Sequence, residues 1–474
     1  MTNKYYLWFT AMVSVIYLVL SFLYASNQII TDEQWYLYLN ALDAAKNGNY
    51  SIVGQVLPGV GPTVGSVGNF LTSLPLLFSD SPWAPMTFII ILRFMSFLLF
   101  SIGLRQFFGN KTLCCFAVMY LLSPWFLYET TLTQTSYVIF GVSVVFLSLV
   151  NLRSCRSPEK QDHFFLNPKL TKFLASMCLI LGLGYCLQLS YLSISLVIMV
   201  LFILLRRAIK VSIGGIITGL GIIGLTVWAF LSSILTSDEI GSMFSDAHSF
   251  TDYSPLYLLE NVARGILGWL RLGSTGYSHQ IVRYFDLSII TSQPLSDLLS
   301  YAFVGFIYLV GAGTLLINIY ATFTTLKETK GSIFSWRSLE NDRTFLSIIS
   351  VFAFLALLIS ALVLPLRFQV INVSTFLVFA LLPMLMLIER YRTIPLHYFA
   401  TFLVLLISFT VLVNLVSATS SKRFEQRSTM EIQLLERFEN DEAPEGTIRS
   451  TPETDEAMEA DTNDVNDQTI PPKN

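Results

Sequence analysis

The stretch YYLWFTAMVSVIYLVLSFLYA (5–25) carries no charged residue along its whole length. A helix needs about 20 mostly apolar residues to cross a bilayer, and this stretch meets that requirement. A signal peptide is the alternative, but the apolar run is longer than usual for one and no clear small-x-small cleavage site follows it. We therefore interpret residues 5–25 as an uncleaved first membrane span.

The rest of the chain has the same apolar character. Of its 474 residues 53% are hydrophobic and 13% are charged, whereas a soluble domain has about 25% charged residues. We expect an all-α polytopic membrane protein with about 11 transmembrane helices. The predicted spans are 5–25, 86–104, 112–128, 135–152, 172–188, 190–205, 211–235, 298–320, 344–364, 370–388 and 397–417.

Lysine and arginine are distributed unequally between the two sets of loops. One set holds seventeen: Lys4, Arg105, Lys111, Arg153, Arg156, Lys160, Lys169, Lys172, Arg206, Arg207, Lys210, Lys327, Lys330, Arg337, Arg343, Arg390 and Arg392. The other set holds five: Lys46, Arg264, Arg271, Arg283 and Arg367. Cytoplasmic loops of membrane proteins carry the excess of positive residues. The first set, with the N-terminus, is therefore predicted to be cytoplasmic.

This orientation leaves two long external loops, 26–85 and 236–297, in a membrane domain of residues 1–417. Long loops commonly carry function. Residues 418–474 form an acidic tail, rich beyond residue 441 in Glu, Asp, Thr and Pro. Such a composition cannot bury enough apolar surface to fold, so we expect a largely disordered, dispensable external tail.

Several function classes are disfavoured by the sequence. It has no basic domain of the kind that binds nucleic acid, and no P-loop, dinucleotide fingerprint or nucleophile elbow. Its five cysteines have neither metal-site nor disulfide spacing. No cofactor is expected. A divalent metal site between the two loops, near His248 and His279, remains an alternative.

A helix is predicted at TDEQWYLYLNALDAAKNG (31–48), just after the first span. Thr31 and Gln34 form a capping box, and Trp35, Tyr38, Leu39, Leu42 and Ala45 recur at helical spacing. Asp32 and Glu33 then stand on the first turn at the water–lipid boundary. They either stabilise the helix dipole or accept a proton as a general base.

The order of several motifs resembles the GT-C superfamily of membrane glycosyltransferases, in particular its protein-O-mannosyltransferase and aminoarabinose-transferase-like branch. These motifs are Asp32–Glu33, GPTVGSVGNFLTSLPLLFSDSPWAP (61–85), LRFMSFLLF (92–100) with Arg93, ILGLGYCLQLSYLSISLVIMVLFILLRR (180–207) and LRFQVINVSTFLVFALLPMLML (366–387). The family often has an acidic residue where the fourth span begins. Here Gln134 stands nearby and Glu129 precedes it.

The resemblance implies inverting transfer of a sugar from a polyprenyl-phosphate donor to a hydroxyl of a glycan, lipid or protein acceptor, outside a membrane such as the bacterial inner membrane. Asp32, with Glu33 beside it, would be the base. Cationic groups would bind the donor phosphate.

Candidate cations lie in YLLENVARGILGWLRLG (257–273), which we predict to be an interfacial helix. Its apolar stripe is Leu259, Val262, Ala263, Ile266, Leu267 and Leu270, with Arg264 and Arg271 expected on the opposite side. These two arginines either bind the donor phosphate or contact lipid headgroups. Arg367, at an external helix end, either binds the donor phosphate or extends its side chain to the membrane surface. Arg93, inside a span, should face the bundle interior and pair there, with an acid of the first loop as the candidate partner.

Two other functions have a similar topology. A polysaccharide polymerase or ligase would have arginine-rich external loops as its main feature. A transporter of lipid-linked sugars would show internal repeats and mid-membrane charges, and the sequence shows no repeat.

Overall fold

The computed structural model describes most of the first 419 residues. The described ranges are 3–27, 32–50, 53–57, 61–64, 67–128, 130–155, 167–236, 255–274, 293–334, 342–363, 373–391 and 393–419. Three predictions therefore lie outside the described residues: the nature of the acidic tail beyond Thr419, and the positions of Glu129 and Arg367.

Each of the eleven predicted spans coincides with helical structure. The corresponding elements are α1 (Asn3–Ser26), α4 (Trp83–Leu104), α5 (Asn110–Leu121) continued by α6 (Pro124–Tyr128), α7 (Thr135–Ser154), α8 (Pro168–Leu189), α9 (Ile194–Leu205), α10 (Ile213–Thr236), α14 (Gln293–Phe334), α15 (Asp342–Val363), α17 (Leu377–Arg390) and α18 (Leu396–Thr419). Within the described residues, eight helical segments have the length and apolarity to cross a membrane, and two shorter apolar helices accompany them. The chain is an integral multi-pass membrane protein.

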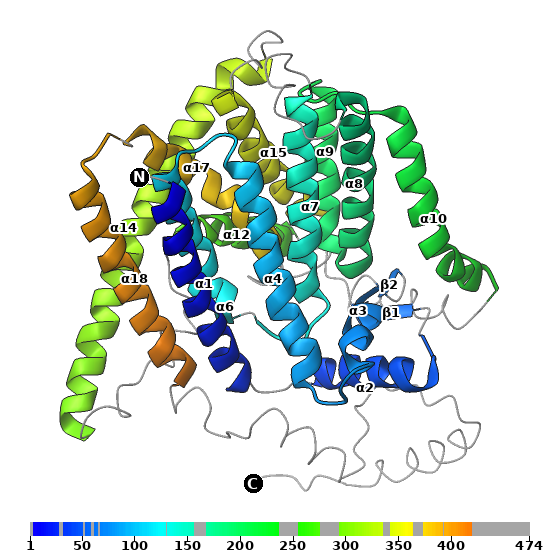
Figure 1. Cartoon of the computed structure of the whole chain (residues 1–474), viewed down its shortest axis with the longest axis horizontal. Coiled ribbons are helices and arrows are strands. Elements are labelled where there is room, and N and C mark those ends of the chain that lie inside the picture. The colour runs from blue at the N-terminus through cyan, green and yellow to red at the C-terminus, as the bar shows by residue number, and fades with distance from the viewer. Residues whose placement is uncertain are drawn as a thin grey trace, which may run out of the picture.

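The long helices run roughly side by side, so that their ends form two opposite faces of the bundle (Figure 1). We call one face the basic end, because helices begin or end there beside arginine and lysine. It includes Arg105, Lys111, Arg153, Arg206, Arg343 and Arg390. The N-terminus lies at this end, and the elements between α1 and α4 lie at the other, the opposite end.

The core is formed by α4, α5, α7, α15 and α17. Aromatic rings join α4 to α5 and α7: the ring centroids of Phe97 and Phe116 are 5.7 Å apart, and those of Phe100 and Phe146 are 5.5 Å apart. The span formed by α5 and α6 is 89% buried within the protein, whereas that of α14 is 17% buried. The first is therefore central, and α14 lies at the periphery.

Glycines let α8 and α10 approach closely. A side chain at Gly215 would come within 2.4 Å of the Phe173 carbonyl oxygen, and one at Gly219 within 3.1 Å of the Met177 carbonyl oxygen. Small residues four apart are a common way to pack membrane helices, because they bring two backbones into contact.

The first long loop is structured at the opposite end. It contains α2 (Asp32–Asn47), strands β1 (Val53–Leu57) and β2 (Gly61–Val64), and α3 (Val67–Leu76). The two strands pair antiparallel with one irregularity in register, and they form a small hairpin beside the helices of the described residues. Figure 1 shows α2 lying across the ends of the long helices.

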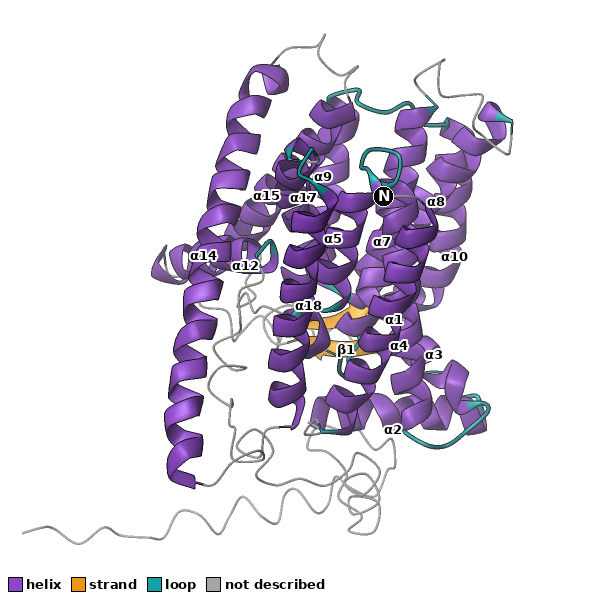
Figure 2. Cartoon of the chain, turned by 60° about the vertical axis from the view of Figure 1, so that its left-hand side comes forward, coloured by secondary structure: helices purple, strands orange, loops and turns teal. Residues whose placement is uncertain are grey.

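The second long loop contributes α12 (Pro255–Leu272). This helix packs against α14, α15 and α17, and Figure 2 shows it crossing the long helices at about the middle of their length. α14 is longer than the predicted span 298–320. Its 42 residues correspond to about 63 Å of helix, about twice the thickness of a hydrocarbon core.

Candidate functional site

Helix α2 is fixed by its buried face. Trp35 and Tyr38 are buried and their rings stack with centroids 6.1 Å apart. The Tyr38 hydroxyl donates to the Asp80 carbonyl oxygen at 2.5 Å, and Lys46 Nζ lies 2.7 Å from Asp80 Oδ2. Burial, with the Asp80 charge as a second cause, raises the pKa of Tyr38 to about 12. The predicted apolar stripe is thus confirmed at its two aromatic positions, and α2 is held against the turn after α3.

Both ends of α2 match the sequence signals. The helix begins at Asp32, so Asp32 and Glu33 occupy its first turn as predicted, although their side chains lie outside the described part of the structure. At the other end Gly48 has a φ of +72°, the left-handed conformation that commonly terminates helices. The backbone positions of both candidate carboxylates are therefore set by a helix and not by an irregular loop.

Helix α3 packs against α7 and so attaches the first long loop to the bundle. The Thr72 and Tyr137 hydroxyls are 2.9 Å apart. A side chain at Gly68 would come within 2.7 Å of the Gln134 side chain. Gln134 therefore fills a packing position between α3 and α7.

Arg93 faces the bundle interior, as predicted, and is 3% exposed. Its NH1 group donates to the Phe126 carbonyl oxygen and to Thr130 Oγ1, both at 2.7 Å, and its guanidinium carbon lies 4.4 Å from the centre of the Phe126 ring. The expectation of an acidic partner from the first loop remains a prediction. Arg93 fixes α6 and the residues after it to α4.

The burial of α12 corrects the predicted helix orientation. Its buried face is formed by Asn261, Gly265, Gly268, Trp269 and Leu272, whereas Leu259 and Leu267 of the predicted stripe are 66% and 47% exposed. The reason is close packing by small residues: a side chain at Gly268 would meet Val373, and one at Gly273 would meet the Ala380 carbonyl oxygen at 2.4 Å. Simple apolar periodicity does not reveal a glycine face.

The two arginines of α12 have different surroundings. Arg264 donates through Nε and NH2 to Glu260 Oε1, at 2.8 and 2.5 Å, and so forms an ion pair with its own helix. The guanidinium carbon of Arg271, in the last turn, lies 6.0 Å from the ring centre of Trp125 on α6. Both lie beside the exposed row Leu256, Leu259 and Leu267. The prediction that they lie on the side opposite to the apolar residues is therefore wrong.

Helix α6 brings two of the predicted residues together. Arg93 of α4 contacts Phe126, and Arg271 of α12 contacts the adjacent Trp125. Figures 1 and 2 show α2 at the outermost level of the opposite end, beyond the level of α12. The structure thus groups Arg93 and Arg271 around α6, with α2 farther out along the bundle.

Sequence reasoning missed Trp125 and Thr130. Both lie in PWFLYETT (124–131), which covers the end of the predicted span 112–128 and the three residues after it. The proline that opens this short aromatic helix was the available signal, since proline favours the first turn of a new helix. Within the described residues, no group of three or more His, Cys, Asp or Glu is placed to hold a metal ion, and His248 and His279 lie outside them.

Comparison with known proteins gives matches among solved structures. No protein-family model and no curated protein matches the sequence. A crystal structure of ArnT from Cupriavidus metallidurans in the apo state matches 88% of this chain and 78% of that chain, at 14% identity and a TM-score of 0.42. An Archaeoglobus fulgidus oligosaccharyltransferase tethered with an acceptor peptide matches 89% of this chain, at 13% identity and a TM-score of 0.45.

This chain spans 56% of the length of the archaeal protein. The function proposed below therefore rests on this chain's own residues and not on these matches.

Proposed function

We propose that this protein is a membrane glycosyltransferase that moves a sugar from a polyprenyl-phosphate donor to a hydroxyl acceptor at the external face. The observation that carries the proposal is the environment of Arg271. Its guanidinium lies over Trp125 and beside a row of exposed leucines on the same helix. A cation bordered by lipid-accessible apolar surface suits an amphiphile that joins a phosphate to a hydrocarbon chain.

The leucine row extends along α12 away from Arg271. Leu267 lies one turn before it, and Leu256 and Leu259, which are 78% and 66% exposed, continue the row. Exposed leucines are costly in water but not against a hydrocarbon chain. We assign them to the polyprenyl tail and Arg271 to the phosphate. Arg264 has a weaker claim on the phosphate, because Glu260 balances its charge.

The transfer step needs one base and one stabilised leaving group. The acceptor oxygen attacks the anomeric carbon, the bond from that carbon to the phosphate oxygen breaks, and polyprenyl phosphate leaves with the electron pair. The acceptor proton passes to a carboxylate, which we propose is Asp32, with Glu33 beside it. A position on the first turn of α2 favours the ionised carboxylate, since a helix N-terminus stabilises negative charge. Arg271 would balance the charge on the departing phosphate.

Transfer assays with purified variants in lipid vesicles test both roles. Asp32→Asn keeps the side-chain size and should lower turnover about 100-fold or more, the usual contribution of a positioned base. Glu33→Gln should do less, because the next position on a helix points about 100° away. Arg271→Gln should raise the donor KM, whereas Arg264→Gln, a change in an ion-paired arginine of the same helix, should raise it less. Near-normal transfer by well-folded Asp32→Asn would remove Asp32 from the mechanism.

A further inference from the structure

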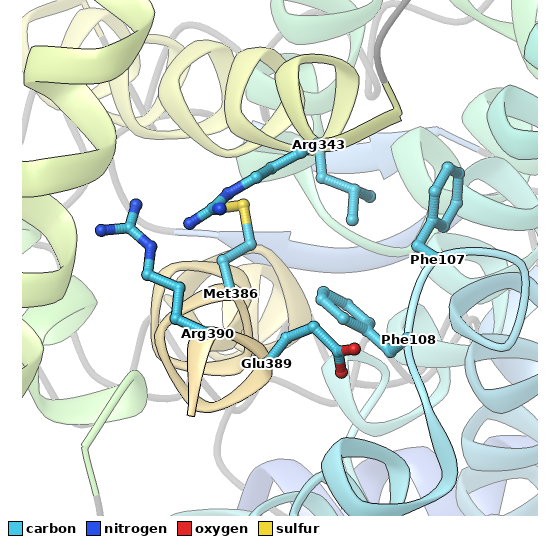
Figure 3. Close-up of a pocket in the computed structure, with 7 residues that line it drawn as sticks. Phe107, Phe108, Arg343, Met386, Glu389 and Arg390 are labelled. Carbon is cyan, nitrogen blue, oxygen red and sulfur yellow. The ribbon is translucent and has the colours of Figure 1, made fainter. Parts of the chain in front are cut away.

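A cavity of about 240 Å³ lies at the basic end, far from the proposed transfer site. It is formed by the turn after α4, the first turn of α15 and the last turns of α17, and it is lined by Phe107, Phe108, Arg343, Leu346, Met386, Glu389 and Arg390 (Figure 3). Leu346, Met386 and Phe108 are buried side chains that give it an apolar wall. Its volume is below the 300–1,000 Å³ typical of sites for drug-sized molecules. It therefore fits a headgroup-sized ligand.

Two arginines border the cavity on one side. The side chains of Arg343 and Arg390 are 45% and 29% exposed, and Figure 3 shows both guanidinium groups extending to the same side of Met386. Glu328 of α14 forms an ion pair with Arg390 and lies 4.0 Å from Arg343. Glu328 thus lies between the two guanidinium groups, and both groups remain partly exposed at the mouth of the cavity.

Glu389 contributes its negative charge elsewhere. Its Oε2 accepts from the Thr112 hydroxyl at 2.6 Å and from the Gly109 backbone N–H at 3.2 Å, at the beginning of α5. A carboxylate in this position stabilises the positive end of the helix dipole. Figure 3 shows the Glu389 carboxylate pointing away from both guanidinium groups.

Exposed aromatic residues mark the membrane boundary near the cavity. Tyr391 follows the last turn of α17 and Tyr398 lies in the first turn of α18. Tyr5 and Trp8 occupy the start of α1, and all four side chains are exposed. Tyrosine and tryptophan concentrate at the membrane–water interface. The cavity therefore lies at the depth of lipid headgroups.

We propose that this cavity binds the phosphate headgroup of an anionic glycerophospholipid. Arg343 and Arg390 bind the phosphate, Phe107 and Met386 contact the first carbons of the lipid, and the acyl chains stay in the bilayer. Basic pockets between transmembrane helices are known binding sites for anionic headgroups, and arginine matches the geometry of phosphate oxygens. This inference goes beyond the proposed transferase function, since the site lies at the other end of the bundle.

The test compares full-length protein in phosphatidylcholine vesicles with and without phosphatidylglycerol, with lipid affinity measured from the rise in Tm. Wild-type protein should be stabilised by phosphatidylglycerol. The Arg343→Gln/Arg390→Gln variant should bind it roughly 30-fold more weakly, at about fivefold per arginine. The control variant Lys327→Gln/Lys330→Gln also loses two positive charges at the basic end, from α14 and outside the cavity lining, and should bind nearly as wild type.

The Glu328→Gln variant separates lipid binding from a structural ion-pair network. It removes the carboxylate that competes for both arginines, so it should tighten phosphatidylglycerol binding even if it lowers Tm in phosphatidylcholine alone. A purely structural network predicts no tightening. The proposal is overturned if the double arginine variant binds like wild type, if the lysine control weakens binding equally, or if inorganic phosphate alone stabilises the protein as much as the lipid does. If the double glutamine variant does not fold, Arg343→Lys/Arg390→Lys keeps both charges and should retain most of the binding.

Discussion

Arg93 is a charged side chain within an apolar bundle, and its contacts suggest a measurable coupling. It donates to Thr130 Oγ1 and to a carbonyl oxygen of α6. A hydrogen bond from a charged donor contributes about 1.5–3 kcal/mol. A double-mutant cycle of Arg93→Met with Thr130→Val should therefore show a coupling of about that size in the unfolding free energy, measured by denaturation in mixed micelles. The control cycle of Arg105→Met with Thr130→Val should be additive, because Arg105 lies at the basic end.

Tyr38 gives a pH dependence with a defined sign. Its pKa is raised from 10 to about 12 in the folded protein, so the folded state keeps the phenolic proton longer than the unfolded state does. The stability contributed by this group is complete below pH 10 and is lost as the pH rises from 10 to 12. Wild-type Tm should therefore fall across this range more steeply than that of Tyr38→Phe. Parallel pH profiles would show that Tyr38 does not limit alkaline stability.

At the scale of elements, the position of α12 depends on Gly273. A side chain there would lie 2.4 Å from the Ala380 carbonyl oxygen and 2.7 Å from Asn318 Nδ2. Gly273→Ala should force α12 away from α17 and α14 and cost about 1–3 kcal/mol, the usual cost of overpacking. It should also raise the donor KM, because Arg271 lies two residues away. Thermal unfolding and transfer assays measure the two effects.

The matched control is Gly313→Ala on α14, where a side chain would meet nothing within 4 Å. Alanine favours helix over glycine by about 1 kcal/mol, so this variant should be as stable as wild type or slightly more stable. Equal losses from both replacements would show that close packing at Gly273 does not position α12.

The spans were predictable because a bilayer imposes length and apolarity on each helix separately. The start of α2 was predictable for a similar reason, since Asp32 and the residues around it carry the local signals of a helix N-terminus. The hairpin of β1 and β2 was not predicted. Its sequence is rich in Pro and Gly, and the pairing of the two strands depends on contacts that this local sequence does not reveal.

The candidate site was predictable only in part. Arg93 had to face inward because of the cost of a charge in lipid. The side of α12 that is buried was not evident, because it depends on Gly265, Gly268 and Trp269 matching the surfaces of helices far away in sequence. The approach of Arg271 to Trp125 likewise joins residues from distant elements. Such pairings follow from tertiary packing, which periodicity in one helix does not encode.

At the scale of the whole molecule, the two ends of the bundle are chemically distinct. The basic end gathers arginines around α15 and α17, with the cavity that we assign to lipid. The opposite end carries α2 with Asp32 and the small hairpin. A transferase that takes its donor from the external leaflet needs α2 outside, so the proposed function requires one orientation in the membrane.

Cysteine labelling in intact cells tests that orientation directly. Asp43 on α2 and Lys327 on α14 are suitable label sites, because both are exposed and their helices place them at opposite ends of the bundle. The background replaces Cys155 and Cys178, the two partly exposed native cysteines, with serine. A membrane-impermeant maleimide should label Asp43→Cys in intact cells and Lys327→Cys only after permeabilisation, because seventeen basic residues flank one face and five the other. The reverse pattern would place α2 in the cytoplasm, and Asp32 could then not serve transfer at the external face.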